Sequence, residues 1–152
     1  TGFPEIHELV SRTNIEGQPA LEDANVQSKI ADWYVKSSGL KNNANRMITA
    51  LSKGELPGPE NSIGKLVAGN MMQDIAKFAI DLQGPGGVLV DPLVAEGAAR
   101  FQAMLLRSPA VRIEGGTDQI LRNIIGERVL GLPEDMRADK GIPFNEIPTS
   151  GS

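Results

Sequence analysis

The longest hydrophobic pattern in the chain runs from about residue 20 to residue 53. Its apolar and small residues recur at alternating steps of three and four, as they do on one face of an α-helix. They are Val26, Ile30, Trp33, Ser37, Leu40, Ala44, Met47 and Leu51. Lys53 and Gly54 then supply a basic last turn and a glycine cap. The pattern therefore predicts one long helix that ends at these two residues.

A tight connection at residues 56–59 leads into a second helical pattern. Pro59 suits the first turn of a helix, and the carboxylate of Glu60 is favourable at its positively polarised N-terminus. The apolar stripe that follows consists of Ile63, Leu66, Val67, Met71, Ile75, Phe78, Ala79 and Leu82. A short link between two long amphipathic helices predicts that they pack as antiparallel neighbours.

Shorter helical patterns cover residues 3–11, 94–107 and 117–130, whereas strand-like alternation is weak and confined to residues 88–90. The glycine-bearing segments 83–87 and 112–116 are predicted to be loops, because neither a helix nor a strand accommodates them. The elements together predict an all-α fold, an up-and-down four-helix bundle with four or five helices in all.

The chain divides into three parts by composition. Residues 1–19 form the remnant of a first helix and a polar turn, and residues 20–133 carry the helical bundle domain. Residues 134–152 are polar and contain several proline and glycine residues, so we expect an extended or disordered C-terminal tail.

Composition excludes several classes of function. The net charge of -4 and the pI near 5.0 argue against a nucleic-acid binder, which needs a basic face. Because the chain has no cysteine and His7 is its single histidine, disulfides, thiolate chemistry and multi-histidine metal sites are excluded, and no metal is predicted. No apolar run reaches the roughly 18–20 residues of a membrane helix. These features predict a cytoplasmic protein without a membrane span.

The segment at residues 115–133 has the clearest candidate chemistry. Two glycines lead into Thr117, a good helix N-cap, and Asp118 supports the first turn. Such a helix start presents free backbone N–H groups that suit a phosphate or another anion. A plain helix cap in a loop that requires glycine explains the same residues. The spacing matches neither a P-loop nor a dinucleotide-binding glycine fingerprint.

This segment resembles the last helix of acyl-CoA dehydrogenases, which typically reads Gly-Gly-Thr-Ser-Glu-Ile-Gln-Arg-Asn-Ile-Ile-Ala-Glu-Arg-Val-Leu-Gly-Leu-Pro. Residues 56–62, 82–87 and 141–145 are similar to further segments of bacterial members of the family. The resemblance covers most of the chain from about residue 20. It implies the C-terminal four-helix bundle of a flavoenzyme that has two further domains, an N-terminal helical domain and a middle β domain.

The resemblance also implies a cofactor and site residues. FAD lies between the domains of these enzymes and across a subunit interface. Thr117 and Gln119 match positions that contact FAD, Gly116 lies in the loop before them, and Gly84 matches a glycine loop that packs against the dinucleotide of a partner subunit. Ile80 stands where the family often has a glutamine. The family's Arg-Lys-x-Phe-Gly loop, which supplies an arginine to the pyrophosphate, does not occur in residues 1–25.

The catalytic base of the family is a glutamate that removes the α-proton of an acyl-CoA, and it must be desolvated so that its pKa rises. Many members place it directly before the Gly-Thr of the last loop, where this chain has Gly115. Glu114, one residue earlier, is the candidate base in this chain. Two alternatives stay open: Glu114 is a solvated carboxylate paired with Arg112, or the base lies on the first helix of the domain, largely before Thr1.

The resemblance thus implies the C-terminal domain of an FAD-dependent acyl-CoA dehydrogenase, which is expected to be inactive by itself and to contribute a subunit interface and part of the FAD site. The expected partners are an acyl-CoA substrate, further subunits in a dimer or tetramer, and an electron-transfer flavoprotein. The alternative is a non-catalytic helical oligomerisation module or a partner subunit with a degenerate site. The sequence leaves the acyl chain and the electron acceptor undefined.

Overall fold

The computed structural model describes residues 2–134, 139 and 141–147. The helices are α1 (Phe3–Arg12), α2 (Ala24–Ser52), α3 (Asn61–Leu82), α4 (Arg100–Val111) and α5 (Asp118–Ile124). The described strands, β1 (Asn14–Ile15) and β2 (Gln18–Pro19), form a minimal antiparallel hairpin where the sequence predicted only a polar turn. The predicted all-α class is therefore confirmed, with this hairpin as a small addition.

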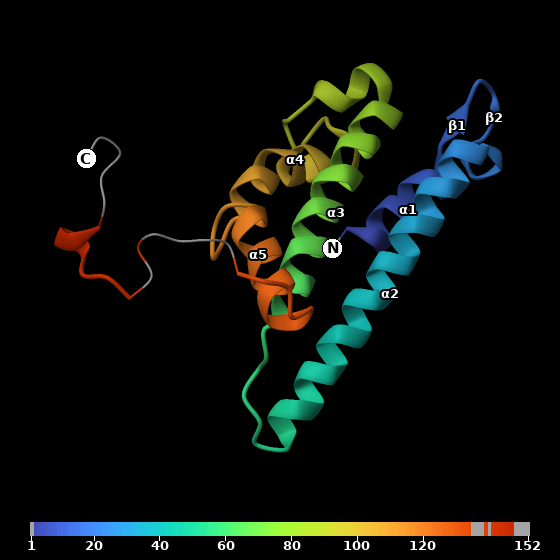
Figure 1. Ribbon diagram of the computed structural model, residues 1–152. Helices are drawn as coiled ribbons and strands as arrows, with labels where there is room; N and C mark the ends of the chain where they lie inside the picture. Colours follow the sequence, from blue (N-terminus) through green and yellow to red (C-terminus); the bar gives the residue numbers. More distant parts are fainter. Residues whose placement is uncertain (1, 135–138, 140, 148–152) are drawn as a thin grey trace.

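Helix α3 lies at the centre of the domain (Figure 1). It runs antiparallel to α2, as the short link between them predicted, and packs against α4 and α5 on its other side. Helix α1 lies alongside the first half of α2 and also touches α3. Because α3 contacts every other helix, side chains on its different faces can anchor several loops at once.

The main core joins α1, α2 and α3. Its buried members are Ile6, Leu9, Val10, Ala20, Val26, Trp33, Met71, Ile75, Ala79 and Phe101. Trp33 is 0% exposed and meets the ring of Phe78 edge to face, with 5.3 Å between ring centroids. Residues from α1 lie in the same core as those of α2 and α3, so the first helix is packed as an integral part of the described domain.

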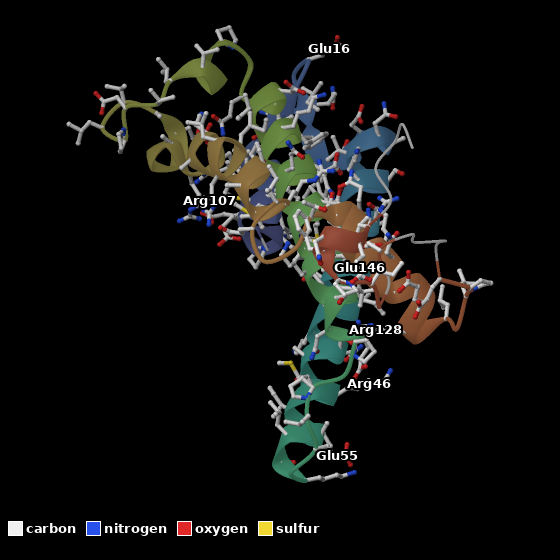
Figure 2. The ribbon with its side chains drawn as sticks, turned by 60° about the vertical axis from the view of Figure 1, so that its left-hand side comes forward. Glu16, Arg46, Glu55, Arg107, Arg128 and Glu146 are labelled. Atoms are coloured by element: carbon white, nitrogen blue, oxygen red, sulfur yellow. The ribbon has the colours of Figure 1, made fainter. Side chains whose placement is uncertain are left out.

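Helix α2 extends beyond the helices that pack against it. The carboxylate of Asp23 caps it by accepting hydrogen bonds from the amides of Asn25 and Val26. Its buried residues all lie in the first half, and Leu51, predicted to lie on the inner face, is 47% exposed. Figure 2 shows the second half of α2 and the following turn, marked by Arg46 and Glu55, projecting beyond the other helices.

The second half of the chain departs from the predicted helix bounds. The helix expected at residues 94–107 begins only at Arg100, because Gly97 and Ala99 adopt left-handed backbone conformations that interrupt it. Residues 84–88 form a 3-10 turn, and residues 88–90 form no strand. The last predicted helix, 117–130, is observed as α5 followed by a π-helical turn at Ile125–Val129.

The tail prediction for residues 134–152 falls largely outside the described residues. Its described part contains a 3-10 turn at Phe144–Glu146. Within the part of the chain that the structure describes, no helix combines the length and apolar character that crossing a bilayer requires. The same residues contain no group of three or more His, Cys, Asp or Glu side chains arranged to hold a metal ion.

Candidate functional site

The α4–α5 loop, residues 112–117, connects two helices through a pair of glycines. Gly115 has a φ of 61° and Gly116 a φ of 109°, values that L side chains rarely adopt. Thr117 then caps α5, because its hydroxyl accepts a hydrogen bond from the amide of Ile120 at 3.3 Å. The N-cap predicted from the sequence is confirmed, and the glycines are required by the path of the backbone.

Arg112, at the start of this loop, and Asp118, directly after it, bind each other through their side chains and main chains; we call this contact the Arg112–Asp118 closure. The guanidinium of Arg112 donates to Oδ2 of Asp118 from Nε at 2.7 Å and from Nη2 at 2.6 Å. The amide of Asp118 donates to the carbonyl oxygen of Arg112 at 3.2 Å. The side chain of Asp118 is only 7% exposed, so this pair lies largely out of water.

The pKa of the Asp118 carboxyl reflects this setting. Burial raises the pKa, because it penalises the charged carboxylate. Hydrogen bonds from Arg112 and Asn70 to the carboxylate outweigh the burial, and the positive charges of Arg112 and Arg122 act in the same direction. The net result is a pKa below the ordinary value of 3.8, so Asp118 is an anion at neutral pH.

Helix α3 supplies three side chains that hold the loop from below. Lys65 donates from Nζ to the carbonyl oxygens of Val111 at 3.1 Å and Gly116 at 2.7 Å. Asn70 donates to Oδ2 of Asp118 at 3.2 Å, and Gln73 accepts a hydrogen bond from Nη1 of Arg112. The sequence did not identify these three residues, because polar positions on an amphipathic helix usually face solvent.

Gly69 allows this close approach of α3 to the loop. It is buried, and a Cβ placed on it would lie 3.4 Å from Cγ of Arg112 and 3.6 Å from Cγ1 of Val111. Gly69 lies one turn after Lys65 and one turn before Gln73, on the same face of α3. The spacing of four residues is the signal in the sequence that would have indicated this contact face.

Gly116, Thr117 and Gln119 lie together at the end of this loop, as their spacing predicted. Gly116 and Thr117 are half-buried, and the amide side chain of Gln119 is exposed. The hydroxyl of Thr117 uses an oxygen lone pair to cap α5 and keeps its O–H donor. The described structure gives the Thr117 main-chain amide no hydrogen-bond acceptor.

Gly84 lies far from these residues. It follows the C-terminus of α3, whereas the α4–α5 loop packs near Lys65 in the first turns of the same helix. Eighteen residues separate Lys65 from Gln83, or about 27 Å at about 1.5 Å per residue. Within one chain the structure therefore does not bring Gly84 together with Thr117 and Gln119.

The loop at Gly84–Val88 has its own anchor. The buried side chain of Gln102 donates from Nε2 to the carbonyl oxygen of Gly87 at 3.0 Å and to Oε1 of Gln83 at 3.1 Å. Gly87 packs so closely on α3 that a Cβ would lie 2.3 Å from the carbonyl oxygen of Ile80. Gly84 itself is exposed, has a φ of 56° and has nothing within 4 Å of its Cβ position.

Glu114 forms an ion pair with Arg107 of α4. Nη2 of Arg107 lies 2.7 Å from both carboxylate oxygens, and the side chain of Glu114 is 51% exposed. The pairing with Arg112 that the sequence suggested is wrong, because Arg112 is occupied by Asp118 and Gln73. Half of the Glu114 side chain is in water and its carboxylate has a cationic partner, whereas a general base requires a dry site.

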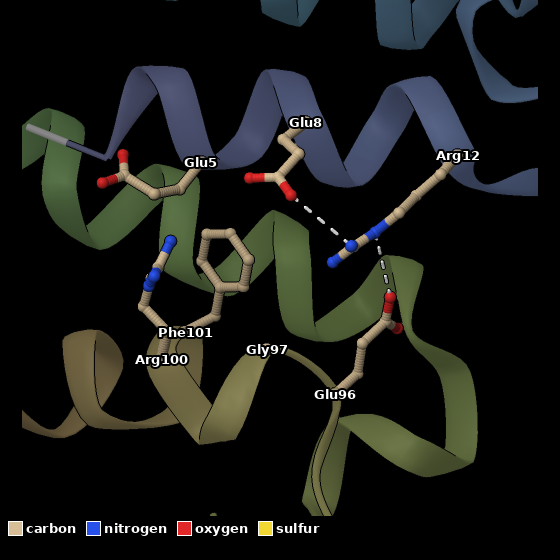
Figure 3. Close-up of a pocket in the computed structure, with 7 residues that line it drawn as sticks. All are labelled: Glu5, Glu8, Arg12, Glu96, Gly97, Arg100 and Phe101. Atoms are coloured by element: carbon tan, nitrogen blue, oxygen red, sulfur yellow. Dashed lines mark ion pairs between the residues drawn. The ribbon is translucent and has the colours of Figure 1, made fainter.

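A separate cleft of about 520 Å³ lies between α1 and the start of α4 (Figure 3). Arg12 crosses it, with guanidinium contacts to Glu8 at 3.5 Å and to Glu96 at 3.4 Å. Glu5 and Arg100 line the same cleft, which therefore contains charges of both signs. None of the site residues predicted from the sequence lines this cleft.

The antiparallel helices and the glycine loop that caps α5 define a helical-bundle domain. Comparison with known families identifies its type, since the family model described as "Acyl-CoA dehydrogenase, C-terminal domain" matches residues 1–130. The chain belongs to this family. It is 32% identical over 130 residues to the acyl-CoA dehydrogenase IpdE1 of Mycolicibacterium smegmatis. That match covers 86% of this chain but 30% of the relative, so the chain spans under a third of that protein's length.

Solved structures confirm the fold. The ChsE4–ChsE5 complex from Mycobacterium tuberculosis superposes with a TM-score of 0.71 at 22% identity, over 87% of this chain and 35% of that chain. The Tcur3481–Tcur3483 steroid ACAD superposes with a TM-score of 0.70 at 20% identity, over 86% of this chain and 34% of that chain. At these identities the likeness establishes the fold alone.

Proposed function

We propose that this chain forms the C-terminal helical part of an FAD-dependent acyl-CoA dehydrogenase and contributes a subunit interface and one wall of the FAD site. The observation that carries the proposal is the α4–α5 loop. Its glycine pair, its N-cap and its Arg112–Asp118 closure hold the half-buried Thr117 and the exposed Gln119 together at the start of α5. By itself the chain is expected to be inactive, since it corresponds to a minor part of its relatives.

The donors at this loop suit an acceptor-rich cofactor such as FAD. The O–H of Thr117, its main-chain N–H and the amide of Gln119 can all donate hydrogen bonds. The two glycines give the loop its left-handed backbone path, and their Cβ positions face Lys65 and Leu121. A bound FAD would supply the acceptor for the hydride that leaves the β-carbon of the acyl group. Thr117 and Gln119 would then bind the FAD and orient it from one side.

Gly84 is proposed to serve the FAD of a neighbouring subunit. The α4–α5 loop contacts the first half of α3 through Lys65 and Asn70, whereas Gly84 follows the last turn of the same helix. We therefore expect the two loops of one chain to contact two different FAD molecules. The exposed position of Gly84 and the open space at its Cβ position leave room for a dinucleotide to approach.

Exposed apolar side chains support a role in assembly. They include Tyr34, Val35, Ile48, Leu51, Val88, Val90, Leu93, Val94 and Leu106. Those at residues 48–51 lie on the part of α2 that projects beyond the other helices (Figure 2). Apolar surface of this kind is typical of residues that another subunit covers. We therefore propose a dimer or tetramer, with an acyl-CoA substrate and an electron-transfer flavoprotein as the acceptor.

A subunit with a degenerate site is the second candidate. Two observations favour it: Gly115 occupies the position where many family members place the base, and Glu114 beside it is ion-paired and half exposed. In this case the chain would stabilise a catalytic partner subunit. A helical oligomerisation module without any catalytic partner is the limiting form of the same proposal.

The visible spectrum of the natural full-length protein, with any subunit that copurifies, tests the proposal. We expect a flavin spectrum that bleaches anaerobically with one member of an acyl-CoA panel of short, long and polycyclic acyl groups. A protein that stays colourless with added FAD would rule out the dehydrogenase role of this subunit. A flavin that binds but is not reduced, unless a second subunit is present, would favour the degenerate-site candidate.

Glu114 is tested by a matched pair of substitutions, Glu114→Gln and Arg107→Gln. Both remove the ion pair between α4 and the loop, but only the first removes a carboxylate. If Glu114 only ties the loop to α4, the two variants reduce the flavin at similar rates. If Glu114 is the base, Glu114→Gln abolishes reduction while Arg107→Gln retains it.

A further inference from the structure

Lys65 places its charged ammonium group against two main-chain carbonyl oxygens. Its ammonium group bonds to the carbonyl oxygens of Val111, at the end of α4, and Gly116, at the other end of the α4–α5 loop. These residues are 46 and 51 positions away in the sequence. No ion pair joins Lys65 to a carboxylate within the described part of the chain. Its two hydrogen bonds therefore join α3 to the end of α4 and to the second glycine of this loop.

Capping of α4 explains only part of this arrangement. A lysine at a helix C-terminus stabilises the last carbonyl groups, and the bond to Val111 is of this kind. Gly116 does not belong to α4, and its bond to Lys65 is the shorter one, at 2.7 Å. Because this bond reaches the second glycine of the loop, it restrains the residue whose backbone would otherwise have the most freedom.

The bond also fixes the orientation of the next peptide group. In a trans peptide the C=O and the following N–H point in opposite directions. The carbonyl of Gly116 points at Lys65, so the N–H of Thr117 points away from it, and no described acceptor takes its hydrogen. Rotation of this one peptide would turn the donor inward and remove it from the exposed end of the loop.

We propose that Lys65 is a positioning residue for cofactor binding: it holds the Gly116–Thr117 peptide so that the Thr117 N–H stays available to donate a hydrogen bond to FAD. The inference rests on the proposed function for its cofactor. It extends that function to a residue on α3 that has no direct part in the predicted site. The other anchors from α3, Asn70 and Gln73, act on the Arg112–Asp118 closure and leave the glycine peptide to Lys65.

Hydrogen–deuterium exchange on this chain tests the positioning by itself. Lys65→Met keeps the length of the side chain but removes the donors, whereas Lys65→Arg retains them. Lys77→Met removes an exposed lysine from the same helix and is the matched control. We expect Lys65→Met to raise exchange at residues 113–119 by about tenfold or more, the loss that charged hydrogen bonds typically cause. Exchange in the core of α1 and α2 should stay unchanged in all three variants.

Flavin affinity of the natural full-length protein tests the consequence. We expect Lys65→Met to weaken FAD binding by about tenfold, with Lys65→Arg restoring most of the affinity. Unchanged loop exchange in Lys65→Met would overturn the positioning role. Faster exchange with unchanged FAD affinity would overturn the link to the cofactor. If the unsubstituted protein binds no FAD, the proposed function fails, while loop exchange still decides whether Lys65 positions the peptide.

Discussion

Asp74 on α3 accepts a hydrogen bond at 2.9 Å from the indole Nε1 of Trp33, the single tryptophan of the chain, on α2. The same carboxylate lies 3.2 Å from Nζ of Lys29, which also stands 5.7 Å from the centre of the indole ring. The indole is completely buried, so its N–H has no access to water. This contact joins the two longest helices at the edge of the apolar core, where the side chain of Asp74 is 42% exposed.

Replacement of Asp74 by leucine should destabilise the chain by about 1–3 kcal/mol, because the buried indole N–H loses its acceptor. Asp74→Asn should cost less, since an amide oxygen can still accept the bond while only the exposed pairing with Lys29 is weakened. Urea unfolding monitored by the fluorescence of Trp33 measures both. Equal unfolding free energies for the two variants would show that the hydrogen bond to Trp33 contributes little.

The fit of Gly87 against α3 gives a second prediction. A methyl group on Gly87 would lie 2.3 Å from the main-chain carbonyl oxygen of Ile80, which cannot rotate away as a side chain can. Gly87→Ala should therefore cost about 1–3 kcal/mol of stability, as overpacking typically does. Gly86→Ala places its methyl group in open space and serves as the control. Thermal unfolding should separate the variants, and equal melting temperatures would contradict the close packing.

The sequence predicted the fold because each main helix carries a continuous apolar stripe. Trp33 and Ile75 lie in the core as those stripes required. The stripe could not show that Leu51 would be 47% exposed, because periodicity identifies a face without showing whether anything covers it. The start of α4 was also missed, since only the backbone path reveals the left-handed conformation of Ala99.

The candidate site, like the fold, was predictable from the sequence only in part. The N-cap at Thr117 depends on neighbouring residues and could be predicted from them. The contacts from Lys65 to Gly116 and from Arg107 to Glu114 depend on how helices pack, which local patterns do not specify. Polar residues that face solvent and polar residues that anchor a loop have the same spacing on a helix, so sequence alone does not distinguish them.

The acid sensitivity of the domain should depend on Asp118. Because its pKa in the folded chain lies below the ordinary value of 3.8, the charged carboxylate stabilises the fold fully above that value. This contribution is lost as the pH falls through the lowered pKa. Asp118→Asn should therefore cost about 1–3 kcal/mol at neutral pH through the loss of the Arg112 pair. The difference in unfolding free energy between Asp118→Asn and the unsubstituted chain should narrow only below pH 3.8.

Urea unfolding between pH 7 and pH 2 measures this difference. Asp32→Asn is the control, because Asp32 forms an exposed pair with Lys36 one helical turn away, a type of contact that contributes about 0.3–0.5 kcal/mol. Its unfolding free energy should differ from that of the unsubstituted chain by no more than about this amount. A difference for Asp118→Asn that stays constant down to pH 2 would mean that the Asp118 carboxylate does not titrate with folding. The closure of the α4–α5 loop would then depend on shape more than on charge.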